Sequence, residues 1–134
     1  MRAAIIAALP YTLVVFAAGA ALGTLRTLVL APRVGEGPAI LLEVPAMLAV
    51  SYGVARWAVR LARVPACLSP RLAMGAAAFV MLQAAEAALS ALILGRSPAE
   101  HWATIVSAER LVGLAAQGAF AAMPALLLIG SRRR

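Results

Sequence analysis

Four long apolar runs constrain the fold of this chain more than any other feature of its sequence. They cover about residues 3–31, 39–61, 72–95 and 111–130, with short segments rich in Arg, Pro and Gly between them. A helix needs about 20 apolar residues to cross a hydrocarbon core of ~30 Å, so each run is long enough to span a membrane. The chain of 134 residues is 64% hydrophobic and 13% charged, which excludes both a small water-soluble domain and a disordered chain.

Each run is expected to form a helix. A lone strand in lipid would leave its backbone polar groups unpaired, at a cost of several kcal/mol each. The runs also lack the alternation of apolar and polar residues that is typical of a membrane β-barrel. We therefore predict an all-α fold, a polytopic transmembrane bundle of four helices that run up and down in one domain. Pro10, Pro45 and Pro124 lie inside spans, where membrane helices tolerate proline.

The segments between the runs predict where helices end and begin. Pro and Gly at high density between Pro32 and Pro38 predict a loop after the first span. A second polar connector is expected from Arg60 to Arg71. Further on, Ser97 followed by Glu100 is typical of a helix start, with Ser97 as the N-cap residue and Glu100 at the third helical position.

The distribution of arginine predicts the orientation of the bundle. With four spans, the two termini and the middle connector share one side, which carries eight of the twelve arginines. Basic residues favour the cytoplasmic side, so both termini are predicted to be cytoplasmic. In an alternative interpretation the first run is a signal peptide that is cleaved after the small residues Ala18 to Ala20. That would leave three spans.

Polar residues inside the spans are the main candidates for function, because burying them in lipid is costly. All of them are expected in the outer half of the bundle, and they are Arg26, Glu43, Gln83, Glu86 and Gln117. Arg26 is the natural counter-ion of Glu43 or Glu86. Gln83 and Glu86 are three residues apart and face the same side of a helix. The cluster either pairs internally to fix helix packing or holds a proton or a small ligand.

The outer loop contains a second candidate. Arg33 and Glu36, with Gly on both sides of Glu36, could bind a small anion or a lipid head group, or simply form a tight interfacial turn. The sequence has one His, one Cys and no Asp, so we expect no metal site, no cofactor and no catalytic set. The net charge of +7 is interpreted as a membrane topology signal, so no nucleic acid partner is expected.

Small residues four apart predict places where helices pack closely. Gly19 and Gly23 form such a pair in the first span, and Gly113 and Gly118 begin similar patterns in the fourth. Packing within the chain and packing in a homo-oligomer both remain open, as does a membrane protein partner besides the lipid bilayer.

Several stretches of the first two spans resemble small four-span bacterial inner-membrane proteins of uncharacterised function. They are Gly23 to Arg26, Ala31 to Glu36, Leu42 to Pro45 and Ser51 to Trp57. The resemblance implies a membrane location and no defined activity. We therefore expect a non-enzymatic accessory or structural bundle with a buried polar cluster in its outer half. The alternative is a small oligomeric transporter or channel that uses Glu86 as a proton or cation site.

Overall fold

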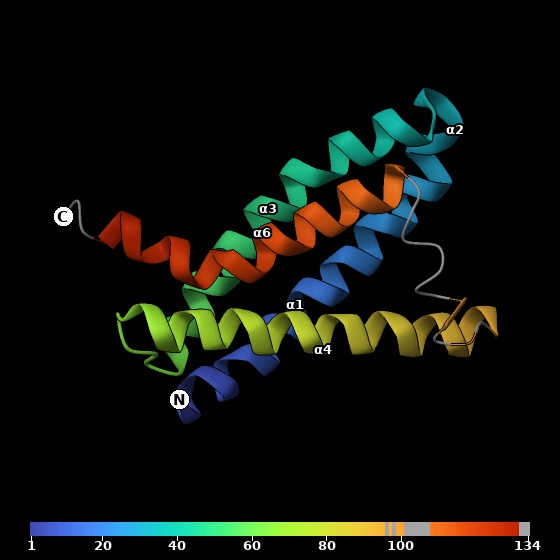
Figure 1. The fold of residues 1–134 in the computed structure, drawn as a ribbon. Coiled ribbons are helices and arrows are strands. Elements are labelled where there is room, and N and C mark those ends of the chain that lie inside the picture. The colour runs from blue at the N-terminus through green and yellow to red at the C-terminus, as the bar shows by residue number, and fades with distance from the viewer. Residues whose placement is uncertain (96, 98, 101–107, 132–134) are drawn as a thin grey trace.

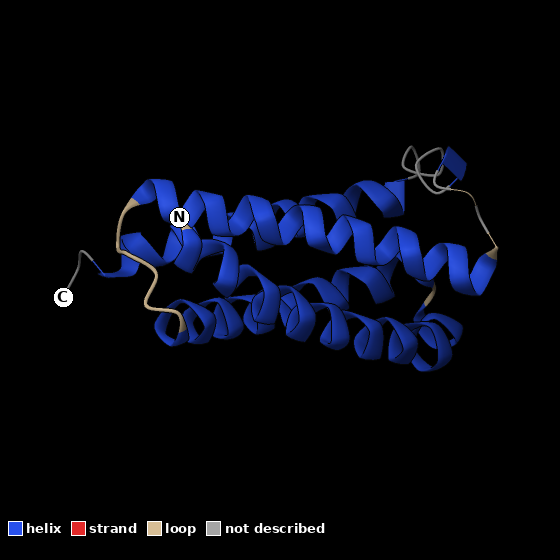
Figure 2. Cartoon of the chain, turned by 90° about the horizontal axis from the view of Figure 1, so that it is seen from below, coloured by secondary structure: helices blue, strands red, loops and turns tan. Residues whose placement is uncertain are grey.

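The structure is a computed structural model that describes residues 1–95, 97, 99–100 and 108–131. The described part is all-helical, and four of its helices are long and apolar enough to cross a membrane. The long helices are α1 (Arg2–Leu25), α3 (Glu36–Leu61), α4 (Leu68–Leu94) and α6 (Ala108–Ser131). They run alternately up and down, so the start of α1 and the end of α6 lie at the same end of the bundle (Figure 1, Figure 2). The predicted fold class is confirmed.

The helices form a four-sided arrangement. Among the described residues, α1 and α6 each pack against both α3 and α4, and neither α1 with α6 nor α3 with α4 forms a comparable helix contact. The connection from α3 to α4 therefore crosses the bundle diagonally. Towards the end opposite the two termini, α4 points away from α3 and its preceding turn (Figure 1). The bundle is consequently packed at one end and spread at the other.

The first transmembrane helix extends further than the sequence predicts. Helical structure runs without a break from Arg2 to Val34, through a π-helical segment η1 (Arg26–Leu30) and a short helix α2 (Ala31–Val34). The ring of Pro32 would clash with the carbonyl of Leu28 in a regular α-helix. The wider π turn, in which the Ala31 N–H reaches the carbonyl of Arg26, lies immediately before this proline. A helix of 33 residues is about 50 Å long, more than a hydrocarbon core requires.

The predicted loop from Pro32 to Pro38 was wrong. Gly35 is the one residue between α2 and α3 that is not helical, and its φ of 88° is a conformation that glycine adopts easily. Pro38 lies in the first turn of α3, where a residue without an N–H costs nothing because that group has no helical partner. The reversal between the first two spans is thus a tight turn at Gly35.

The middle connector is also shorter than predicted. Helix α4 begins at Leu68, so Ser69, Pro70 and Arg71 belong to its first turn. The guanidinium of Arg71 is buried and donates hydrogen bonds to the carbonyls of Val64 and Pro65, 3.3 and 3.1 Å away. Arg71 therefore holds the connector against the helix that follows it.

The predicted helix start after α4 is confirmed for its described residues. The Ser97 N–H donates to the Glu100 carboxylate over 2.7 Å, and the Glu100 N–H donates to the Ser97 hydroxyl over 3.2 Å. This reciprocal pair is the capping box that the spacing of the two residues predicts. Four arginines that belong to the count of twelve, Arg96 and Arg132 to Arg134, lie outside the described residues.

Close helix packing occurs at a glycine that the sequence patterns did not indicate. A Cβ atom on Gly75 would overlap the carbonyl oxygen of Ala121, so α4 and α6 pack backbone to backbone there. Within the chain, the expected close packing at Gly113 and Gly118 does not occur, since a Cβ atom on either residue would meet nothing within 4 Å. Gly19 approaches the side chain of Met47, whereas Gly23 faces open space.

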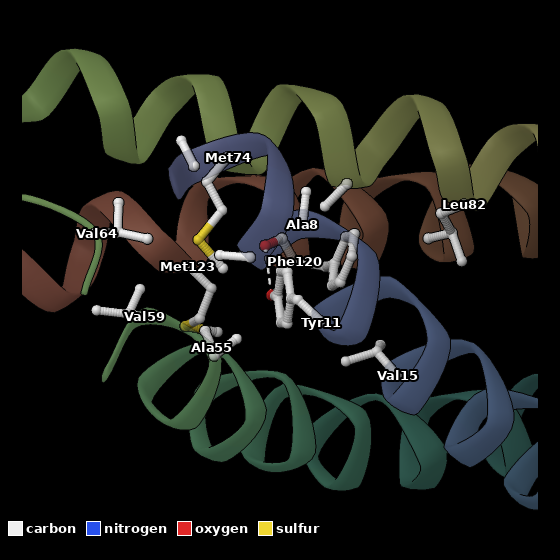
Figure 3. Packing of buried hydrophobic residues seen from close by; sticks show 14 residues of the cluster. Ala8, Tyr11, Val15, Ala55, Val59, Val64, Met74, Leu82, Phe120 and Met123 are labelled. Atoms are coloured by element: carbon white, nitrogen blue, oxygen red, sulfur yellow. Dashed lines mark hydrogen bonds between the residues drawn. The ribbon is translucent and has the colours of Figure 1, made fainter. Parts of the chain in front are cut away.

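The buried core lies in the packed half of the bundle. Small residues on α1 and α3 allow neighbouring helices to approach, and larger side chains from α1, α4 and α6 fill the centre (Figure 3). The main contributors are Ala4, Ala7, Ala8, Tyr11, Ala55, Ala58, Met74, Phe120 and Met123. This half closes the bundle on the side of the two termini.

Candidate ligand cavity

A half-open cavity of about 620 Å³ lies in the spread half of the bundle. Its wall takes residues from α1, η1, α3, α4 and α6, so the cavity lies between the four long helices. Glu36, at the turn between α2 and α3, is part of the wall and its side chain is 71% exposed. The cavity therefore reaches the surface at the end opposite the two termini.

All five polar residues that the sequence singled out line this one cavity. They are Arg26, Glu43, Gln83, Glu86 and Gln117. Each is partly buried, and they come from four different helical segments. The apolar part of the wall includes Val15, Phe16, Leu82, Leu89, Leu114 and Phe120. Polar groups on an apolar wall are the usual make-up of a small-molecule pocket.

Arg26 forms an ion pair with Glu43 across the helical hairpin of the first two spans. The Arg26 Nε donates to the Glu43 Oε2 over 2.7 Å, and the two side chains are only 22% and 18% exposed. Of the two counter-ions proposed for Arg26, the structure selects Glu43. A second Arg26 nitrogen, Nη1, lies 3.5 Å from Glu36. Arg26 occupies the first position of the π-helical segment, a type of irregularity that recurs at functional sites.

The second polar contact joins α4 and α6. The Gln117 side-chain amide donates a hydrogen bond of 2.6 Å to Oε1 of Glu86. Glu86 forms no ion pair with any described residue. Gln83 lies one helical turn before Glu86 and lines the cavity as well. The carboxyl group of Glu86 is therefore held by a neutral amide and has no cationic partner among the described residues.

The two residues of the outer-loop candidate, Arg33 and Glu36, have different surroundings. Glu36 faces Arg26, whereas Arg33 is exposed and forms no ion pair in the described structure. Arg33 and Glu36 are separated by Gly35, whose positive φ reverses the chain between them. The structure thus joins Glu36 to the cavity and leaves Arg33 outside it.

Phe120 lies at the inner end, or floor, of the cavity, and Tyr11, which the sequence arguments had not selected, packs against it. Their rings stack with centroids 4.4 Å apart, and the Tyr11 hydroxyl donates to the Phe120 carbonyl over 2.8 Å (Figure 3). In a regular helix this carbonyl would accept the N–H of residue 124, but Pro124 has none. Tyr11 on α1 therefore supplies the donor that the proline of α6 lacks.

Two further polar side chains lie near the floor. Ser51 on α3 is 2% exposed and lines the cavity, and Thr12 donates a hydrogen bond of 3.3 Å to the carbonyl of Ala78. The signal for Ser51 and Tyr11 was available, because a polar group in an apolar span needs a partner. No group of three or more His, Cys, Asp or Glu side chains that could hold a metal occurs among the described residues.

Comparisons of the chain with protein families, with curated proteins and with solved structures find no match.

Proposed function

We propose that this chain is a non-enzymatic integral membrane protein that binds a small ligand in its cavity. The observation that carries the proposal is that the five polar residues of the spans line one cavity, which has an apolar wall and reaches the surface at one end. A purely structural role would require the Arg26–Glu43 ion pair and the Gln117–Glu86 hydrogen bond but no cavity beside them. A volume of about 620 Å³ falls in the range of small-molecule sites.

The closed floor favours binding over conduction. The stacked rings of Tyr11 and Phe120, with the core beneath them, fill the bundle between the cavity and the end that carries the termini. A channel or transporter that uses Glu86 would have to open this layer. We therefore propose a binding protein. Its ligand enters and leaves on the side of the membrane on which the cavity opens.

We place the bundle in a bacterial inner membrane with both termini in the cytoplasm. The end with the termini carries Arg2, Arg56, Arg60, Arg63 and Arg71, and the opposite end carries Arg26 and Arg33. The excess of arginine supports a cytoplasmic location for the first of these ends. In this orientation the cavity opens to the outer side of the membrane.

Two glycines of α6 offer a test of the proposal. Gly113 lines the cavity and a Cβ atom there would meet nothing within 4 Å, so a Gly113→Phe side chain has room to enter the cavity. Gly118, on the same helix, also has free space around its Cβ position, but it is exposed and does not line the cavity. Gly118→Phe is therefore a matched control for the loss of a helical glycine.

The experiment measures binding by titration calorimetry in phosphatidylcholine nanodiscs, with empty nanodiscs as the blank. The probes share a 4-phenylbutyl body and carry a trimethylammonium, an alcohol or a sulfonate head group. We expect at least one probe to bind the wild type and Gly118→Phe, and to lose binding in Gly113→Phe. Binding of no probe to the folded wild type, or equal binding to all three proteins, would contradict the proposal.

A further inference from the structure

The charges on the cavity wall do not balance. Three carboxylates, those of Glu36, Glu43 and Glu86, line the cavity together with one guanidinium, that of Arg26. The excess of carboxylates indicates which charge a ligand would carry. This inference rests on the proposed function, that the cavity binds a ligand.

The single cation of the wall is already engaged. Arg26 lies 2.7 Å from Glu43 and 3.5 Å from Glu36, so both of its carboxylate neighbours compete with any anion that might enter. An anionic ligand would have to displace Glu43 from a partly buried ion pair. Removing one partner of such a pair leaves a charge uncompensated in a poorly solvated place.

Glu86, unlike Arg26, has no oppositely charged partner among the described residues. Its Oε1 accepts the Gln117 amide over 2.6 Å, whereas its Oε2 has no hydrogen-bond partner in the described structure. An amide lowers the cost of burying the carboxylate but does not neutralise it. A positively charged group in the cavity would supply both the missing counter-charge and, where it has an N–H, the missing donor.

The wall around Glu86 suits an organic cation better than a metal ion. Leu82 and Leu89 flank Glu86 on α4, and the aromatic rings of Phe16 and Phe120 contribute to the same cavity. Aromatic rings attract organic cations, and the apolar side chains can cover an apolar body. A metal ion would need several ligating side chains, and one free carboxylate oxygen does not provide them.

We infer that the cavity binds an amphiphilic organic cation, with its charged group at Glu86 and its apolar body against the walls from α1, α4 and α6. The competing possibility is that Glu86 carries a proton. A neutral carboxyl group would remove the preference for a cation, so a comparison of head groups distinguishes the two states directly.

The test uses the same three 4-phenylbutyl probes in phosphatidylcholine nanodiscs, a lipid without net charge. We expect the trimethylammonium probe to bind the wild type at least about tenfold more tightly than the sulfonate probe. Glu86→Gln keeps the shape of the side chain and should weaken the trimethylammonium probe by about tenfold, a change of roughly 1.4 kcal/mol. Binding of the alcohol probe should change less than about twofold, which also reports that the variant is folded.

Glu100→Gln is the matched control. Glu100 lies outside the cavity, and glutamine can replace glutamate in a capping box. Its affinities should equal those of the wild type. Equal or tighter binding of the sulfonate probe to the wild type would overturn the inference, and so would an unchanged trimethylammonium affinity in Glu86→Gln.

The two proposals fail in different ways. If the alcohol probe binds and Gly113→Phe abolishes its binding while the head group makes no difference, the cavity binds ligands but the inference of a cation is wrong. If none of the three probes binds the folded protein, the proposed function is wrong and the inference falls with it.

Discussion

The hydroxyl of Tyr11 donates to the carbonyl of Phe120, 2.8 Å away, at the position where Pro124 leaves that carbonyl without its helical partner. The contact crosses the bundle from α1 to α6, two described helices that lie diagonally opposite each other without close backbone contact. Membrane helices tolerate proline where a neighbouring side chain satisfies the freed backbone group. Here the compensating donor also stacks on the ring of Phe120, which lines the cavity.

This relationship predicts an energetic coupling between Tyr11 and Pro124. Tyr11→Phe should lower the free energy of unfolding by about 1–2 kcal/mol, because a buried carbonyl loses its donor. In a Pro124→Ala background the backbone N–H of residue 124 can take over, so the same substitution should cost about 1 kcal/mol less. Denaturation of the four proteins of this cycle in mixed micelles measures the coupling. Equal costs of Tyr11→Phe in both backgrounds would show that Pro124 does not create the need for the hydroxyl.

The contact between α4 and α6 at Gly75 predicts a steric effect. Gly75→Ala places a methyl group on the carbonyl oxygen of Ala121, so the two helices must separate. Overpacking of this kind costs about 1–3 kcal/mol of unfolding free energy. Gly53→Ala is the control, because Gly53 lies in α3 with nothing within 4 Å of its Cβ position. That variant should be neutral or more stable by up to about 1 kcal/mol, and a similar loss in both variants would argue against close packing at Gly75.

Arg26 contacts both Glu36 and Glu43, so we predict that removing Arg26 destabilises the protein more than removing the charge of Glu43. Arg26→Gln leaves Glu43 without a cation, whereas Glu43→Gln leaves Arg26 with Glu36 at 3.5 Å. Because the pair is only partly buried, we expect a loss of about 2–3 kcal/mol for Arg26→Gln and about 1 kcal/mol for Glu43→Gln. The double substitution should be less destabilising than the sum of the two. The same denaturation measurement tests this, and a larger loss for Glu43→Gln would contradict it.

The native cysteine is a probe of orientation. Cys67 is the one cysteine of the chain, and it is free and exposed in the connector between α3 and α4. A membrane-impermeant maleimide should label it only after the cells are opened, because this end is proposed to be cytoplasmic. In a Cys67→Ser background, Ala99→Cys at the opposite end should be labelled in intact cells. Labelling of Cys67 in intact cells would reverse the proposed topology.

Much of the fold could be predicted because its cause is local in the sequence. An apolar run of sufficient length in lipid has one stable form, the helix, and four such runs with short connections give an up-and-down bundle. The Arg26–Glu43 pair was one of two predicted partnerships for the same reason, since the tight turn places the two residues side by side.

Features that depend on the distance between two backbones could not be predicted. The overlap at Gly75 requires knowledge that Ala121 faces it, and many other small residues of the chain are equally suited to such a contact. The helix continues through Pro32 because of a π turn that begins six residues earlier, at Arg26. The spacing of the prolines alone does not reveal this local rearrangement. The sequence indicates that the Tyr11 hydroxyl and the Phe120 carbonyl each need a hydrogen-bond partner. It does not indicate that they bind each other, because they are 109 residues apart in the chain.

The central claim is that a water-accessible cavity opens on the outer side of the membrane, and thiol modification tests it most directly. In a Cys67→Ser background, Gly113→Cys places a thiol in the cavity wall and Gly118→Cys places one on the exposed face of the same helix. A trimethylammonium methanethiosulfonate reagent added to intact cells should modify Gly113→Cys. The 4-phenylbutyltrimethylammonium probe should slow that reaction. Gly118→Cys, the control, should stay unmodified. If both positions react at the same rate, or if Gly113→Cys reacts only after the cytoplasmic side is exposed, the cavity does not open where we propose.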